Sequence, residues 1–217
     1  MRRWWIAVVL LVIVGCSHAP KGSGHDAASA SDPWEALREG NQRFVSGQPL
    51  RRDLPALRKT LLDVQHPRAA ILTCSDSRVG PEIVFDASLG EVFVVRVAGN
   101  VLDPVVLGSL EYAVEHLHAD LIVVLGHEKC GAIAAATSGE KMPSANLEAL
   151  VTRIAPALAG LPKGSSALAA VEANVRLVGR DLLAGSPILA KEVGEGKLRV
   201  VLAVYRLDSG EVVPLTP

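Results

Sequence analysis

The sequence has few aromatic residues, almost no net charge and no apolar run long enough for a permanent membrane span. Phe, Trp and Tyr make up 4% of its 217 residues, so the core must be built from aliphatic side chains. A formal net charge of -1 excludes the strongly basic surface of a nucleic-acid-binding protein. Hydrophobic residues are nevertheless 49% of the chain, which is typical of a buried parallel sheet covered by Ala-rich helices.

The N-terminal segment differs from the rest of the chain. Two arginines precede an uncharged run over residues 4–15, which is too short to span a bilayer but has the size of a signal-peptide core. The run ends in "IVGC", which resembles the lipobox of bacterial lipoproteins, where the Cys becomes the acylated first residue. We therefore predict a signal peptide over residues 1–15 and lipidation of Cys16. An ordinary signal peptide or a short membrane anchor is the alternative.

Residues 16–31 are rich in Ser, Gly, Ala and Pro and show no apolar periodicity, so we predict a flexible tether. The folded domain is expected over residues 32–217, with Asp32 as the N-cap of its first helix and Pro33 at the first helical position. These features predict an exported lipoprotein that faces the periplasm and is attached to the membrane through its lipid anchor only.

Short, β-branched-rich apolar runs alternate with segments of helical periodicity in the domain. The runs cover residues 69–73, 92–97, 121–126 and 198–205, and helical spacing covers residues 33–44, 54–64, 103–118, 167–183 and 186–194. This alternation predicts an α/β fold with a mostly parallel central sheet flanked by helices. In such a sheet, functional sites gather at the carboxyl ends of the strands.

Candidate metal ligands follow two of these predicted strands. Cys74 comes directly after the first, and "GHEKCGA" after the third contains His127 and Cys130, spaced to face one point across the first turn of a helix. Two thiolates and one imidazole suit Zn²⁺, and a set of three ligands leaves a coordination position open, as in catalytic sites. A disulfide between Cys74 and Cys130 is the alternative for an exported protein.

The stretch "CSDSR" places Cys74, Asp76 and Arg78 at alternate positions, so their side chains can lie on one side of an extended chain. A carboxylate and a guanidinium beside a metal can form a charge-assisted pair that orients the carboxylate. The alternative for Asp76 and Arg78 is an ordinary surface ion pair.

Four segments, "CSDSR", "VVRVAGN", "GSLEYAVEHL" and "VLGHEKCGA", resemble the successive signatures of the β-class carbonic anhydrases. The resemblance implies a zinc ion bound by Cys74, His127 and Cys130, and a catalytic dyad of Asp76 and Arg78. It also implies a homodimer or tetramer, with the N-terminal helices packing on a partner subunit. Two further positions match family residues that contact substrate, namely Gln65 and Gly131.

The same resemblance implies reversible hydration of CO₂ to bicarbonate and a proton. Asp76 would accept a hydrogen bond from the attacking nucleophile, and Arg78 would keep this carboxylate charged and oriented. Gly99 and Asn100 of "AGN" are expected to shape the backbone around the site. Hydrolysis of carbon disulfide or carbonyl sulfide is an alternative reaction, and a zinc-binding lipoprotein without turnover is an alternative of another class.

Overall fold

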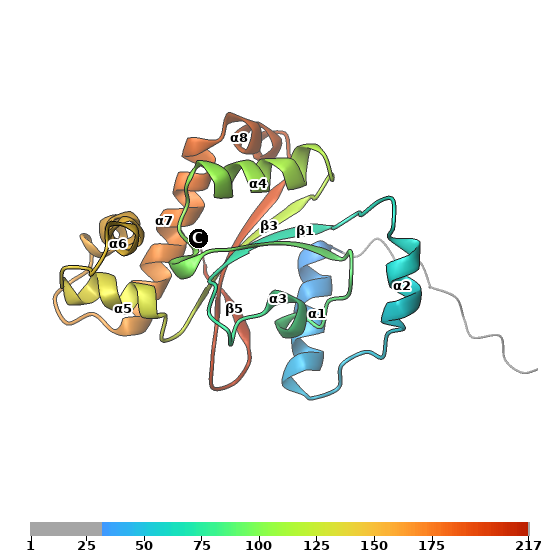
Figure 1. Ribbon diagram of the computed structural model, residues 1–217, viewed down its shortest axis with the longest axis horizontal. Helices are drawn as coiled ribbons and strands as arrows, with labels where there is room; N and C mark the ends of the chain where they lie inside the picture. Colours follow the sequence, from blue (N-terminus) through green and yellow to red (C-terminus); the bar gives the residue numbers. More distant parts are fainter. Residues whose placement is uncertain (1–31, 217) are drawn as a thin grey trace, which may run out of the picture. The chain divides into compact units, whose positions relative to one another are not determined.

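The computed structural model of the protein describes residues 32–216 (Figure 1). The predicted signal peptide, the lipidation site Cys16 and the predicted tether lie outside the described residues, so they stay predictions. Across the described range, no helix combines the length and the apolar character that crossing a membrane requires.

A five-stranded sheet forms the centre of the domain, in the order β2-β1-β3-β4-β5. The first four strands are parallel, and β5 runs antiparallel to β4. The mostly parallel sheet and the four predicted strands are therefore confirmed, whereas the short β5 was not predicted. The strand bounds are β1 Ala69–Thr73, β2 Val92–Arg96, β3 Leu121–His127, β4 Arg199–Tyr205 and β5 Val212–Pro214.

Helices fill the connections between the strands. Asp32 caps the first helix by accepting from the Trp34 N–H, and Asp103 caps α4 by accepting from the Val106 N–H, as N-cap carboxylates do. The helices are α1 Pro33–Val45, α2 Leu54–Thr60, α3 Pro81–Val84, α4 Pro104–Glu115, α5 Gly131–Ser138, α6 Ala145–Leu158, α7 Ala167–Gly185 and α8 Pro187–Gly194, with a 3₁₀ turn, η1, at Ala98–Asn100.

One helix is shorter than predicted. The helical spacing over residues 54–64 extends beyond the end of α2 at Thr60. Helix α2 buries none of its own residues, so packing against the sheet does not stabilise a longer helix here.

The helices cover both faces of the sheet (Figure 1). On one face, α1 and α3 pack through Trp34, Leu37 and Val84 against a cluster that includes Ile71 and Val123. On the other face, α4, α7 and α8 pack against the alternate strand residues, among them Leu72, Ile122 and Val124. Both faces of β1 and β3 are thus buried, which explains the continuous apolar character of these strands.

The N-terminal helices differ in how they pack on their own chain. Trp34 and Leu37 of α1 are buried in the same subunit, at 8% and 6% exposure. Helix α2 has no buried residue. The packing of these helices on a partner subunit is not tested by a single chain and stays a prediction.

Candidate metal centre

Cys74, His127 and Cys130 meet at the carboxyl edge of the sheet, as the sequence predicts. One ligand atom from each lies within 4.8 Å of the others, and all three residues are buried. Cys74 directly follows β1, and His127 is the last residue of β3, which is the neighbour of β1. Cys130 is the N-cap of α5.

The arrangement of His127 and Cys130 corrects one sequence-based prediction. The two residues do not share a helical turn, because His127 ends a strand and Cys130 precedes the helix. A tight turn at Glu128 and Lys129 joins them, and Lys129 has a positive φ of 52°. The turn spans only these two residues, and the imidazole and the thiol still lie in one cluster, with ligand atoms within 4.8 Å.

The His127 ring has one occupied and one free nitrogen. Its Nδ1 lies 2.8 Å from the carbonyl oxygen of Glu128, which requires a proton on Nδ1. Its Nε2 is buried and has no hydrogen-bond partner in the described protein. A buried nitrogen of this kind needs a ligand. The Glu128 carboxylate is itself held by Arg206, at 2.8 Å, and by the Leu207 N–H, at 3.1 Å.

The sulfur atoms of Cys74 and Cys130 are 4.0 Å apart, and both cysteines are free. A disulfide would need about 2.05 Å, so the alternative of a disulfide is not realised in this structure. Two thiolates bound to one tetrahedral zinc at about 2.3 Å would be roughly 3.8 Å apart, close to the observed separation. The donor set therefore fits zinc in spacing, softness and number.

The pKa values of the two thiols are shifted in opposite directions. A hydrogen bond from the Cys130 thiol outweighs burial and, with a smaller contribution from the nearby His127 ring, lowers the pKa of Cys74 well below that of an ordinary thiol. The same contact raises the pKa of Cys130, because its proton is held by the Cys74 thiolate, and burial acts in the same direction. One thiolate is thus already favoured before any metal enters.

The backbone of η1 supports Cys74. The Gly99 N–H donates to the Cys74 sulfur at 3.3 Å, which confirms the expectation that the "AGN" segment shapes the site. Gly99 adopts a positive φ of 69°, and an added Cβ there would lie 2.8 Å from Ile154 Cδ1. The buried Asn174 donates to the Gly99 carbonyl at 2.9 Å and so fixes this turn from α7.

Asp76 and Arg78 form a bidentate salt bridge. Nε of Arg78 donates to Oδ1 of Asp76 at 2.8 Å, and Nη2 donates to Oδ2 at 2.7 Å. The Arg78 side chain holds the pKa of Asp76 well below its usual range, although burial opposes this shift. Oδ2 of Asp76 is 4.0 Å from Nε2 of His127, so the carboxylate lies beside the ligand cluster and is more than a surface ion pair.

The two residues matched to substrate contacts lie in different places. Gly131 begins α5 directly after Cys130, and an added Cβ there would meet no atom within 4 Å. Gln65 precedes β1 and lines a hollow with His66 and Tyr112, whereas the ligand cluster lies beyond the other end of that strand. A single chain thus brings Gly131, but not Gln65, to the cluster.

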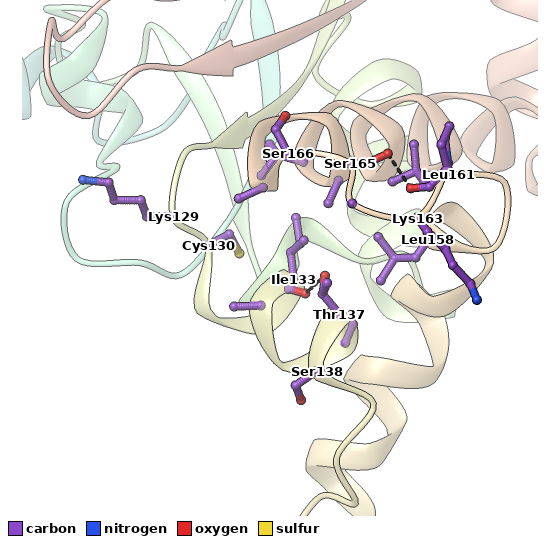
Figure 2. Close-up of a pocket in the computed structure, with 17 residues that line it drawn as sticks. Lys129, Cys130, Ile133, Thr137, Ser138, Leu158, Leu161, Lys163, Ser165 and Ser166 are labelled. Carbon is purple, nitrogen blue, oxygen red and sulfur yellow. Dashed lines mark hydrogen bonds between the residues drawn. The ribbon is translucent and has the colours of Figure 1, made fainter.

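Cys130 also borders a cavity of about 600 Å³ between α5 and the beginning of α7 (Figure 2). Figure 2 shows Ile133 and Thr137 of α5 facing Leu158, Leu161 and the loop before α7. Most of the lining is aliphatic, and Lys129 and Lys163 are its charged members. The metal cluster therefore has an accessible apolar space on its α5 side.

Three supporting residues were not found from the sequence. Glu128 orients the turn that holds His127, and Asn174 holds Gly99. Arg96 donates to the carbonyl oxygens of both Cys74 and Asp76. The charge of Arg96 within the apolar run "VFVVRV" is a signal that could have drawn attention to it.

Comparison with known proteins places this geometry in context. A family model described as carbonic anhydrase matches residues 69–212. Carbonic anhydrase 2 of Mycobacterium tuberculosis is 42% identical over 186 residues, covering 83% of this chain and 90% of the relative. A carbonic anhydrase of Mycolicibacterium smegmatis is 42% identical over 185 residues, with 82% and 90% covered. The solved structure of a Coccomyxa beta-carbonic anhydrase in complex with acetazolamide is 29% identical, with a TM-score of 0.68 over 87% of this chain and 86% of that one.

Proposed function

Because the chain belongs to the β-class carbonic anhydrases, enzymes that hydrate CO₂ reversibly, we propose that one zinc ion bound by Cys74, His127 and Cys130 serves this reaction. The observation that carries the proposal is the buried Nε2 of His127, which lacks a protein partner and lies with two cysteine sulfurs in one 4.8 Å cluster. Zinc supplies the Lewis acidity that makes water nucleophilic near neutral pH.

Asp76 is the residue that we assign to orient this nucleophile. Its Oδ2 faces the ligand cluster and can accept a hydrogen bond from the attacking water, which aims an oxygen lone pair at CO₂. Arg78 keeps the carboxylate charged and fixes its plane through two hydrogen bonds. Asp76 therefore places a hydrogen-bond-accepting oxygen, Oδ2, beside the position of the attacking water.

Gly131 is assigned to substrate binding. It leaves open space beside the ligand Cys130, since an added Cβ would meet no atom within 4 Å. As the first residue of α5 it also has a backbone N–H that no carbonyl within the helix can accept. A small electrophile with two oxygens, such as CO₂, can use both the space and the donor.

A CO₂ hydration assay by stopped flow on the zinc-loaded protein tests this function. Turnover by the parent, its loss on zinc removal and its strong reduction in Asp76→Asn support the proposal. The same preparation is offered carbonyl sulfide and carbon disulfide. Hydrolysis of either without CO₂ hydration would favour the alternative hydrolase, and zinc binding without any turnover would leave a non-catalytic zinc protein.

We propose further that the enzyme is a homodimer or tetramer. Leu62, Val64, Leu89 and Tyr112 are exposed apolar residues, at 77%, 55%, 48% and 47%, and they line one hollow with Gln65. Covering them by a second copy would remove this apolar area from water. A role of Gln65 in substrate binding also requires a second copy. In its own chain, the cluster of Cys74, His127 and Cys130 lies beyond the opposite end of β1.

Light scattering tests this assembly. Leu62→Glu should shift the protein toward the monomer, because a carboxylate would be buried in the contact. Ile83→Glu is the matched control, since Ile83 is similarly exposed, at 68%, but does not line the hollow. A parent protein that is monomeric at micromolar concentration would refute the assembly.

The membrane assignment rests on the N-terminal sequence. We propose export, cleavage before Cys16 and acylation of Cys16, so that the enzyme is anchored and faces the periplasm, because the "IVGC" pattern and the polar tether after it favour a lipoprotein. Mass spectrometry of the membrane-extracted protein tests this. Cys16→Ser should lack the lipid mass, and the same lipid mass on that variant would refute the assignment.

A further inference from the structure

The side chain of Arg96 binds two backbone carbonyl oxygens at the candidate metal centre. It is the last residue of β2, the strand beside β1. Its Nε donates to the Cys74 carbonyl oxygen at 3.1 Å, and its Nη2 donates to the Asp76 carbonyl oxygen at 2.6 Å. One guanidinium therefore holds the backbone of a candidate ligand and the backbone of the acid two residues later.

The bonds from the Arg96 side chain lie just beyond the last paired residues of β1 and β2. Thr73 is the register partner of Arg96, and the Val97 N–H donates to the Thr73 carbonyl at 3.1 Å. After Thr73 the chain leaves the sheet, so Arg96 supplies donors that a neighbouring strand would otherwise provide. A guanidinium presents two donors in a fixed fork, which matches two nearby oxygens better than the single nitrogen of an ammonium.

The turn after Cys74 also has bonds of its own. The Val79 N–H donates to the Asp76 carbonyl at 3.1 Å, and the Arg78 N–H donates to Asp76 Oδ1 at 3.0 Å. These bonds fix the internal shape of the turn. The bonds from Arg96 fix its position relative to β2, and thereby the distance of the Asp76 carboxylate from His127.

We propose that Arg96 is a positioning residue for CO₂ hydration, which fixes the Cys74 and Asp76 backbones so that the ligand and the carboxylate keep their places. Arg96 acts through these two residues and does not contact the reacting atoms. The kinetic consequence rests on the proposed function. The consequence for zinc affinity and for the mobility of residues 75–79 does not.

Two variants of the full-length, zinc-loaded protein test the role. Arg96→Gln can donate to one of the two carbonyls, and Arg96→Lys keeps the charge but loses the fork. Support for residues next to a metal site is typically worth about 10–100-fold in affinity or activity. For Arg96→Gln we expect one bound zinc, zinc affinity and kcat each lower by about tenfold or more, and a nearly unchanged KM for CO₂. Arg96→Lys should recover part of each loss.

Hydrogen exchange supplies a readout that turnover does not. The Arg78 and Val79 amides should exchange faster in Arg96→Gln than in the parent, while the amides of β3 stay unchanged. The cobalt-substituted variant should also show an altered visible spectrum if the Cys74 ligand moves. Arg176→Gln is the matched control, because Arg176 likewise donates to a backbone carbonyl, that of Thr216 at 2.7 Å, but not at the metal centre.

The proposal is overturned if zinc affinity and the exchange of Arg78 and Val79 in Arg96→Gln stay within about twofold of the parent. It is also overturned if Arg176→Gln changes both quantities equally, because the effect would then reflect general stability. If Arg96→Gln fails to fold, the same readouts on Arg96→Lys decide. A parent without CO₂ turnover, together with faster exchange and weaker zinc binding in the variant, would refute the proposed function and leave the positioning role standing.

Discussion

Arg78 binds Asp76 through both of its side-chain oxygens, with Nε to Oδ1 at 2.8 Å and Nη2 to Oδ2 at 2.7 Å. This contact lowers the pKa of Asp76, so the carboxylate remains charged well into the acid range. An aspartate whose pKa is depressed loses its charge only when the pH falls through that lowered pKa. Protonation of Asp76 should therefore not limit activity in mildly acid solution.

Removal of the guanidinium should bring the titration of Asp76 to higher pH. In Arg78→Gln the two guanidinium bonds, which lower the pKa of Asp76 most, are gone, while the bond from the backbone N–H of residue 78 remains and burial still raises the pKa. We expect kcat to fall about tenfold near neutral pH and an acid limb of the rate profile to appear at higher pH than in the parent. Arg78→Lys, which keeps the charge, is the control. Parallel profiles for the parent and Arg78→Gln would contradict the assigned role.

Two glycines with nearly the same backbone conformation should respond differently to alanine. Gly99 and Gly139 have φ of 69° and 68°, but only Gly99 lacks room, with Ile154 Cδ1 2.8 Å and Ala132 Cβ 3.2 Å from an added Cβ. We expect Gly139→Ala to lower the free energy of unfolding by about 1 kcal/mol and Gly99→Ala by about 3 kcal/mol. Urea unfolding measures both. Equal losses would show that the packing around η1 adapts without cost.

Asp86 is expected to stabilise the fold through charge. Its carboxylate accepts from Arg43 Nε at 2.6 Å, Arg52 Nη1 at 2.7 Å and the Leu50 N–H at 3.1 Å. Burial opposes the charged form, but the bonds from Arg43 and Arg52 outweigh it and lower the pKa of Asp86. Asp86→Asn should lower the free energy of unfolding by about 2 kcal/mol at neutral pH.

The pH dependence of this loss follows from the sign of the shift. Stability from a depressed pKa is fully present above the unfolded value of 3.8 and is lost as the pH falls through the lower folded value. The difference between parent and Asp86→Asn should therefore shrink below about pH 4. Urea unfolding at neutral and acid pH measures it, and a difference that grows on acidification would contradict the assignment.

The strands and the ligands could be predicted because each depends on local sequence. Residues 69–73 and 121–127 are almost wholly apolar, and such runs are typical of strands buried on both faces. Cys74 and His127 lie at the ends of adjacent parallel strands, so their approach followed from the predicted sheet. Helix α6 was missed because only Ile154 is buried in it and Pro156 interrupts its helical pattern.

The supporting contacts could not be predicted, because they depend on strand register and on backbone atoms. Arg96 and Cys74 are 22 residues apart, and the bond between them goes to a carbonyl that every residue possesses. Asn174 and Gly99 are 75 residues apart and likewise meet through a carbonyl. The tight turn at Lys129 was also missed, since a lysine gives no sequence signal for its positive φ.

The central claim, that zinc bound by three residues drives CO₂ hydration, is tested most directly by titrating the metal-free protein with zinc while measuring the hydration rate. The rate should rise linearly and level off at one zinc per chain. Cys130→Ala, shown by circular dichroism to be folded, should neither bind zinc tightly nor gain activity. Full turnover by the metal-free protein, or a Cys130→Ala variant that still binds one zinc and hydrates CO₂ at the parent rate, would contradict the account.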